Sequence, residues 1–352
     1  MSMRQTRRNW LYWLLYLLSI AILAYVLVYM PIPYLIYKPG TAEEVKPMVT
    51  VQNGDPSESG NFMMTTVSAS YANVILLALS AFDRDAEIQD KDSRLQGRSE
   101  AEYAAQQVYL MDSSQSSAIE AAYHHAGVAY RIVPNHVVVM KLLPDADRDL
   151  LPGDQLLEVE DKAIQDHAQL RSLLEGKRAG DTLSFKLLRD GEVLTREVTL
   201  IPITDPDTGQ QRVGLGVSLA TVQKIKPDSP DHAISFASTN VGGPSAGLIF
   251  TLEIYNQLTP GDLSKGYRIA GTGTIDQDGN VGEIGGIVHK IVAADRKGAD
   301  IFLVPEGNYE AARAKAQAIG TSMELVPVRT LQDALDYLDS KAVKPVKPKP
   351  GS

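Results

Sequence analysis

The chain of 352 residues contains no cysteine. It therefore has no disulfide, no cysteine nucleophile and no thiolate ligand for a metal, and this absence is compatible with any redox compartment. A basic surplus is missing as well, because the formal net charge is −9 and the pI is about 5.2. No basic stripe interrupts this acidic balance, so the sequence argues against a nucleic-acid partner.

Motifs for metals and nucleotides are also absent. There is no His-Glu-x-x-His and no other cluster of metal-ligating side chains, so we expect no metal site. There is no Gly-x-x-x-x-Gly-Lys-Ser/Thr loop to cradle phosphates, so we expect no nucleotide partner and no cofactor. What is present is an ordinary globular composition, 44% hydrophobic, over a length that suggests two or more domains.

An uncharged run from Trp10 to about Tyr37 follows three arginines, Arg4, Arg7 and Arg8. Its core, residues 10–30, is long enough to span a bilayer, for which about 20 apolar residues suffice. The run is longer than a signal-peptide core, and no clear Ala-x-Ala site follows it. Because flanking arginines stay inside, we expect a single-pass anchor in the cell membrane, a cytoplasmic N-terminus and an extracytoplasmic body. A cleaved signal peptide is the alternative, and it would export the body too.

The most distinctive stretch of the body is Gly243-Pro-Ser-Ala-Gly247, which precedes an apolar segment. Glycine and proline favour a tight turn, and the following Leu248, Leu252 and Tyr255 fall at i, i+4 and i+7 of a helix. Ser245 is therefore predicted where a loop enters a helix. Free backbone N–H groups and the helix dipole gather there and can stabilise an oxyanion. A nucleophilic serine and a helix-capping serine both fit this position.

A second glycine-rich stretch, Ile284-Gly-Gly-Ile-Val-His-Lys290, opens another predicted helix. On helical spacing Lys290 shares the apolar face of this helix with Ile287. A lysine on an inward face is unusual, and desolvation would lower its pKa so that it could act as a general base near neutral pH. The structural alternatives are a lysine that snorkels to solvent or one that pairs with Glu283 or Asp295.

Together the two stretches resemble the proteolytic domain of Lon-type proteases. That family has a Gly-Pro-Ser-Ala-Gly nucleophile motif and an Ile-Gly-Gly-x-x-x-Lys motif, which read here as Gly243–Gly247 and Ile284–Lys290. Between them, Ala270-Gly-Thr-Gly-Thr-Ile275 is similar to the family's strand that ends in Thr-Gly. The separation of 45 residues between Ser245 and Lys290 is also close to that of the family.

This resemblance implies a Ser–Lys dyad in which Ser245 is the nucleophile and Lys290 is the general base. Gly243 and Pro244 would shape the nucleophile turn, and Thr272 would orient the lysine. Because no ATPase motif accompanies the dyad, we expect a serine endopeptidase that works without ATP on peptides or unstructured protein segments.

Two other readings remain open at this point. His289 and His232 are candidate bases for a Ser–His pair, although the family pattern does not use the position of His289. The competing function is a non-catalytic, membrane-tethered peptide-binding scaffold or holdase. The intact serine and lysine motifs argue against a scaffold, because a decayed enzyme has no chemical reason to keep both.

Residues 127–203 contain short β-rich runs around one helical piece, and the core Leu150-Leu-Pro-Gly-Asp-Gln-Leu-Leu-Glu-Val159 resembles a PDZ domain of the bacterial protease-associated kind. PDZ domains bind extended peptides by adding a strand to an exposed sheet edge. We expect that edge at Val137, Val138 and Val139. The loop before this strand lacks the usual glycine-rich form, which leaves open a C-terminal carboxylate, an internal peptide segment or a gating role. A β-rich spacer without a ligand is the alternative.

The whole order resembles the membrane-anchored PDZ-plus-Lon-like proteases of Gram-positive bacteria, the YlbL-type family. The implied fold class is mixed α/β and α+β: a Lon-type proteolytic domain with an inserted PDZ domain, preceded by one transmembrane helix. The resemblance to Lon also allows a homo-oligomeric ring. Within this order we expect a helix break at Asp112-Ser-Ser114 and a catalytic-core strand at Val213–Leu219. The expected segments are a cytoplasmic N-terminus (1–9), the transmembrane helix (10–30), a linker (31–48), the N-terminal part of the Lon-like domain (49–126), the PDZ domain (127–204), the Lon-like catalytic core (205–340) and a disordered tail (341–352).

Overall fold

The computed structural model describes residues 3–56, 59–204, 209, 211–237 and 241–345. The chain divides into two compact units, one of Met1–Gly40 with Thr66–Gly97 and one of Thr41–Thr65 with Arg98–Ser352. Two long strands, β1 (Pro31–Glu44) and β3 (Asn61–Asn73), pass from one unit into the other.

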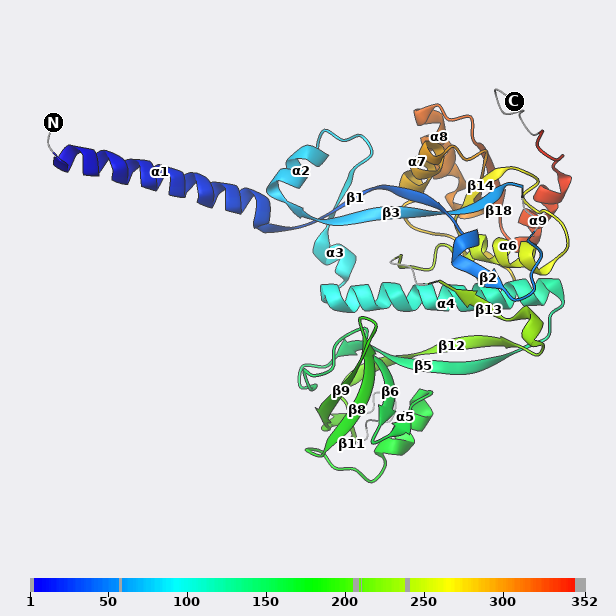
Figure 1. Cartoon of the computed structure of the whole chain (residues 1–352), viewed down its shortest axis with the longest axis horizontal. Helices are drawn as coiled ribbons and strands as arrows, with labels where there is room; N and C mark the ends of the chain where they lie inside the picture. The colour runs from blue at the N-terminus through cyan, green and yellow to red at the C-terminus, as the bar shows by residue number, and fades with distance from the viewer. Residues whose placement is uncertain (1–2, 57–58, 205–208, 210, 238–240, 346–352) are drawn as a thin grey trace. The chain divides into compact units, whose positions relative to one another are not determined.

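The first unit begins with helix α1 (Met3–Tyr29). Its segment Tyr12–Tyr29 has a mean hydropathy of 2.0 and is long and apolar enough to cross a membrane, a property that a signal sequence shares. Three short elements complete the unit, and Figure 1 shows them in cyan and light blue. They are α2 (Val74–Ser80), β4 (Glu87–Asp90) and α3 (Lys91–Leu95).

The predicted linker at residues 31–48 is wrong, because the chain leaves α1 directly into β1. β1 pairs antiparallel with β4 from Tyr34 to Tyr37, between Pro33 and Pro39. Proline lacks an N–H and is tolerated at strand ends, so it marked the limits of this pairing rather than a linker. Gly40 has a different role, since a Cβ at this position would lie 2.3 Å from Thr66 Oγ1. The glycine lets β1 and β3 approach closely.

The second unit is built on a mixed sheet in which β14 lies between β3 and β17, parallel to both, and β18 pairs parallel with β17. The C-terminal strands are β14 (Arg268–Gly271), β17 (Ile301–Pro305) and β18 (Glu324–Val328). Strand β3 comes from before the PDZ-like region and β14 from after it, so that region is an insertion between two neighbouring strands.

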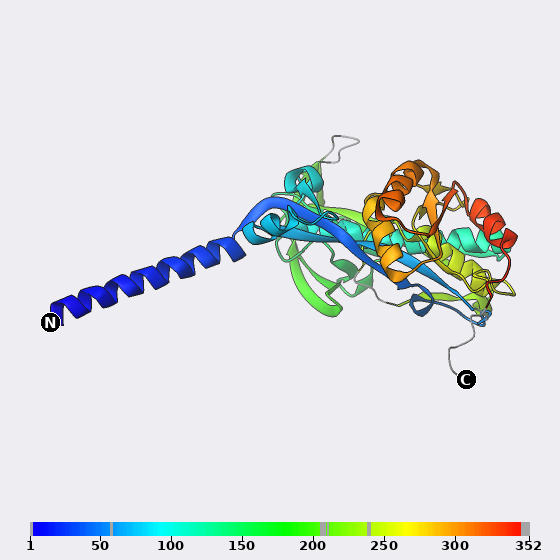
Figure 2. The same ribbon diagram turned by 90° about the horizontal axis from the view of Figure 1, so that it is seen from above.

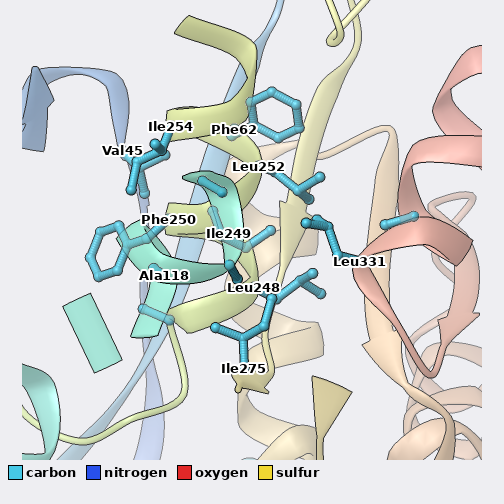
Figure 3. Packing of buried hydrophobic residues seen from close by; sticks show 14 of the residues in the cluster. Val45, Phe62, Ala118, Leu248, Ile249, Phe250, Leu252, Ile254, Ile275 and Leu331 are labelled. Atoms are coloured by element: carbon cyan, nitrogen blue, oxygen red, sulfur yellow. The ribbon is translucent and has the colours of Figure 1, made fainter. Parts of the chain in front are cut away.

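Helices cover both faces of this sheet. Alternate residues of a strand point to opposite faces, so neighbouring residues of β3 contact different helices. Phe62 and Met64 pack with α4 (Glu100–Ala126), α6 (Gly247–Leu258) and α9 (Leu331–Ser340). Met63 packs with α7 (Ile287–Lys297) and α8 (Tyr309–Ile319) on the other side. Figure 3 shows part of the first cluster, in which Phe62 and side chains of α6 lie together with Ala118 of α4 and Leu331 of α9.

Helix α4 is continuous, so the predicted break at Asp112-Ser-Ser114 is wrong. The helix begins with a capping box, in which Ser99 Oγ accepts from the Glu102 N–H and the Glu102 carboxylate accepts from the Ser99 N–H. Ser114, inside the predicted break, bonds to a segment outside the helix. Ser114 Oγ donates to the Pro244 carbonyl at 3.0 Å, outside the helix, so it does not compete with the helical backbone.

The inserted region forms a separate sheet in the order β12-β5-β6-β8-β9, with α5 (His167–Leu174) beside it. Figure 1 shows β5 and β12 as a long antiparallel ribbon. The strands are β5 (Tyr130–Leu142), β6 (Gln155–Val159), β7 (Lys162–Ala163), β8 (Thr182–Arg189), β9 (Glu192–Thr199), β10 (Ile201–Thr204), β11 (Gln211–Gly214) and β12 (Val217–Pro227). The other short elements are η1 (Lys46–Met48), β2 (Val49–Val51), η2 (Pro230–His232), β13 (Ile234–Phe236), β15 (Thr274–Ile275), β16 (Val281–Gly282) and η3 (Glu306–Asn308).

Two predicted boundaries differ from the structure. Val213–Leu219 does not form a catalytic-core strand: its first part pairs with β10 and its second part begins β12, which pairs with β5. The PDZ-like sheet therefore extends past residue 204. The tail expected to be disordered from residue 341 is held at its start, where Lys344 Nζ forms an ion pair with Asp300 and the Lys344 N–H donates to the Lys265 carbonyl. Residues 346–352 lie outside the described part.

Candidate active site

Ser245 lies two residues before the first residue of α6, as predicted for a serine at a loop-to-helix junction. It is not the helix cap, because the N-cap position belongs to Ala246, which has no side-chain cap bond. The Ser245 carbonyl accepts hydrogen bonds from the Gly273 N–H and from Thr272 Oγ1, both at 2.9 Å. These two bonds fix the serine backbone, while its side chain is half-buried rather than sealed.

The turn before Ser245 is held by α4. Gly243 has φ +93°, a conformation that favours glycine, and its N–H donates to the Gln107 carbonyl at 2.8 Å. The Pro244 carbonyl accepts from Ser114 Oγ. Gln107 and Ser114 were not singled out from the sequence, since nothing in their local pattern indicates a contact more than 100 residues away. Both predicted turn residues, Gly243 and Pro244, are thus anchored to one helix.

Lys290 lies on the inward face of α7 and is only 3% exposed. Its Nζ lies 2.8 Å from Ser245 Oγ, 2.8 Å from the Thr65 carbonyl oxygen and 3.1 Å from Thr272 Oγ1. The lysine thus binds two hydroxyls and a backbone carbonyl, rather than Glu283 or Asp295. Thr65, on β3, is a partner that no sequence pattern indicates, because its carbonyl is a backbone group.

Burial lowers the pKa of Lys290 from 10.5 to about 7. The physical cause is the loss of hydration around a charged ammonium, which favours the neutral amine. No carboxylate is among the three partners of Nζ, so none of them offsets this effect. A large fraction of Lys290 is therefore neutral at physiological pH.

A neutral amine satisfies this group of polar atoms completely. It has two N–H donors, which fit the Thr65 carbonyl and Thr272 Oγ1, and one lone pair, which can accept from the Ser245 hydroxyl. The Thr272 hydroxyl in turn donates to the Ser245 carbonyl. In this arrangement each hydrogen has one acceptor, and the Ser245 hydroxyl can donate to the neutral lysine amine.

The two histidines considered as alternative bases, His289 and His232, lie at other places than Lys290. His289 is buried and adjacent to Lys290 in α7, so its side chain leaves the helix about 100° away from that of Lys290. His232 lies in η2, where its carbonyl accepts from Tyr123 Oη. The described contact of Ser245 Oγ with a basic side chain is the one to Lys290.

The predicted peptide-binding edge at Val137, Val138 and Val139 is wrong. These residues lie inside the sheet, because β5 pairs with β12 on one side and with β6 on the other. The described sheet ends in β12 on the side of β5 and in β9 on the opposite side, and α5 contacts both β11 and β12. The glycine-rich turn that seemed absent before β5 precedes β12 instead, as Gly214-Leu-Gly216, with φ +69° at Gly216.

Comparisons with known proteins match the two halves of this architecture. Residues 122–200 match the PDZ domain family, and residues 230–340 match the Lon protease (S16) C-terminal proteolytic domain. Lon protease 2 of Bacillus subtilis is 32% identical over 115 residues, which are 32% of this chain and 20% of that protein. Lon protease of Neorickettsia sennetsu is 31% identical over 100 residues, 28% of this chain and 12% of that protein. The chain thus spans no more than a fifth of either relative.

Among solved structures, the PDZ domain of an SdrC-like protein from Listeria monocytogenes is 21% identical, with a TM-score of 0.21, over 24% of this chain and 87% of that chain. The first family match covers the sheet around β5, and the second covers the region that contains Ser245 and Lys290. The chain therefore combines a PDZ domain with a Lon-type (S16) proteolytic domain.

Proposed function

We propose that this protein is an ATP-independent serine endopeptidase that cleaves peptides or unstructured protein segments with a Ser245–Lys290 dyad. The observation that carries the proposal is the 2.8 Å contact between Ser245 Oγ and the Nζ of a buried lysine. The absence of a phosphate-binding loop from the sequence supports independence from ATP.

The chemistry follows from the hydrogen bonds around the lysine. Neutral Lys290 takes the proton of Ser245 Oγ as the oxygen attacks the scissile carbonyl, and backbone N–H groups at the start of α6 stabilise the resulting oxyanion. Lys290 then gives the proton to the leaving amine as the C–N bond breaks. A water molecule, deprotonated by Lys290, attacks the acyl carbon. The ester bond to Ser245 Oγ then breaks as Lys290 returns the proton to Oγ, which releases the acid and restores the dyad. Thr272 and the Thr65 carbonyl keep the amine aimed at Ser245 throughout.

We assign α1 as a membrane anchor with the body on the extracytoplasmic side. Support comes from the three arginines before the apolar run and from a hydrogen bond at its end, where Asn73 Nδ2 donates to the Val28 carbonyl at 2.7 Å. Asn73 belongs to the folded part that follows, so cleavage of α1 as a signal sequence would remove a partner from the fold.

The test of the endopeptidase assignment is hydrolysis of casein by the full chain in detergent without ATP. We expect the parent to cleave casein and Ser245→Ala to be inactive, with ATP making no difference to the parent. The control is folding of both proteins by circular dichroism. Equal cleavage by Ser245→Ala would refute the assignment. If the folded parent does not cleave, a serine-directed acylating probe that also fails to label Ser245 would point to the scaffold.

We propose that the PDZ domain recruits substrate by adding a peptide strand to β12, next to α5. His167 occupies the first position of α5, and its Nδ1 lies 2.8 Å from Thr221 Oγ1 of β12, so its ring lines the space that an added strand would enter. His167→Ala should raise KM for casein about three- to tenfold, the effect of roughly 1 kcal/mol of lost contact, and leave kcat unchanged.

The matched control for this prediction is His124→Ala, at an exposed position of α4. A short peptide that occupies only the active site should be cleaved equally by the parent and both variants. A fall in kcat for His167→Ala on that short peptide would contradict recruitment and indicate a gating role instead.

A further inference from the structure

Helix α2 has an inverted distribution of polar and apolar residues. A surface helix of a water-soluble domain buries its apolar face and exposes its polar one. In α2 and the turn after it, the polar Ser80 is buried, whereas Leu79 is 61% exposed and Phe82 is 89% exposed. Ile75 and Leu76 are each 39% exposed. Ile75 and Leu79 fall at i and i+4, so they share one side of the helix, and Phe82 follows in the turn after it.

The same helix is tied to the end of the membrane-spanning stretch. One side chain, Asn73, caps α2 by accepting from the Leu76 N–H at 2.7 Å and also donates to the Val28 carbonyl in the last turn of α1. Figures 1 and 2 both show α2 beside the junction of α1 and β1. The apolar stretch of α1 ends at Tyr29 and β1 begins at Pro31, so only one residue separates them.

We propose that the exposed apolar side chains Ile75, Leu76 and Leu79 of α2, with Phe82 in the turn after it, insert into the outer leaflet of the membrane beside α1. This inference rests on the proposed anchor and adds a second, interfacial contact to it. With no linker between the anchor and the fold, the end of α1 must hold α2 at the level of the lipid headgroups. Partial insertion of an apolar helix face is how interfacial helices bind membranes.

Aromatic and charged residues around this face fit the same depth. Tyr29, Tyr34 and Tyr71 are exposed, and tyrosine is enriched at membrane interfaces. The cation Lys38 is paired with Asp83 at 2.9 Å, and acidic residues accompany the basic ones in this unit. The proposed contact is therefore driven by apolar burial rather than by attraction to anionic lipid, and salt should not release it.

The absence of native cysteine allows each position to be labelled singly in the full chain. We would place an environment-sensitive fluorophore on Leu79→Cys and Phe82→Cys in phosphatidylcholine vesicles. Two controls are needed: Ala21→Cys in the middle of the apolar stretch of α1, and Ser322→Cys at an exposed position of the proteolytic domain. Lipids that carry a nitroxide either near the headgroup or deep in the acyl chain serve as quenchers.

We expect the shallow quencher to reduce the fluorescence of the labels at 79 and 82, and to do so also in 1 M salt. The deep quencher should reduce the fluorescence of the label at 21. Neither quencher should affect the label at 322. Quenching at 21 without quenching at 79 and 82 would overturn the inference and leave the anchor intact. A blue-shifted but unquenched label at 82 would mean that a protein, such as a second copy, covers the face. No quenching at 21 would remove the anchor, and the inference with it.

Discussion

Lys290→Met is expected to lose peptide hydrolysis by at least about 10⁴-fold, the scale on which serine peptidases respond to loss of nucleophile or base. The lysine is the base that lies in contact with Ser245 Oγ, at 2.8 Å. Methionine suits the test because it has a similar volume and no charge, so it fills a buried site without a cavity and without the cost of burying an ammonium. The measurement is kcat/KM on a short fluorogenic peptide and on casein.

The matched control for this substitution is Lys297→Met, in the exposed last turn of the same helix. It removes a lysine from α7 without touching Ser245, and activity should stay at the parental level. Both variants must show the parental circular dichroism spectrum. Retention of substantial cleavage by folded Lys290→Met would exclude the dyad and turn attention to His289.

The rate of peptide hydrolysis should rise with pH and reach a plateau above a midpoint near 7. The reason is the pKa of Lys290, which burial lowers to about 7, together with the requirement for the neutral amine as base. At pH 6 about a tenth of the lysine is neutral, so kcat/KM for a short peptide should be about a tenth of its plateau value. The measurement is a pH–rate profile from pH 5.5 to 9.5, with folding verified at each end.

A profile that keeps rising towards pH 10 would show an ordinary lysine pKa and contradict the burial of its charge. Folding stability gives an independent measure of the same group. Because the folded pKa lies below the unfolded value of 10.5, the unfolded chain binds more protons between pH 7 and 10.5, so this group makes the fold more stable as pH rises through that window. Below about pH 7 both states are protonated and its destabilising effect is constant. The parent minus Lys290→Met difference in unfolding free energy should follow this trend.

Local sequence patterns located the chemistry of the site but not its supports. The glycine-rich turn before an apolar helix placed Ser245 at a loop-to-helix junction, and the apolar periodicity around Lys290 placed its side chain inward; the structure agrees with both. Both patterns depend only on neighbours within a turn of helix. Gln107 and the Thr65 carbonyl have no such pattern, because their partners are far away along the chain.

Strand pairing was the part that local reasoning assigned wrongly. The stretch Val137–Val139 has the β-branched composition of a strand, and the sequence cannot tell whether such a strand is an edge or an interior one. The glycine-rich turn at Gly214–Gly216 is in the sequence, but it comes after the PDZ core rather than before it, so its membership of that sheet depends on the long-range pairing of β12 with β5.

The sequence by itself determined the membrane-length apolar helix, the presence of PDZ and Lon-type regions and the two side chains proposed as the dyad, because each is written in composition, period or a short motif. Only the tertiary structure decided that the lysine amine meets the serine hydroxyl, that β12 is the outer strand of the PDZ sheet and that α2 turns its apolar face outward beside α1. Contacts between segments that are distant in the sequence depend on how strands pair and helices pack. That is also why the pKa of Lys290 is a property of the folded chain, since desolvation exists only once the surrounding elements have closed around it.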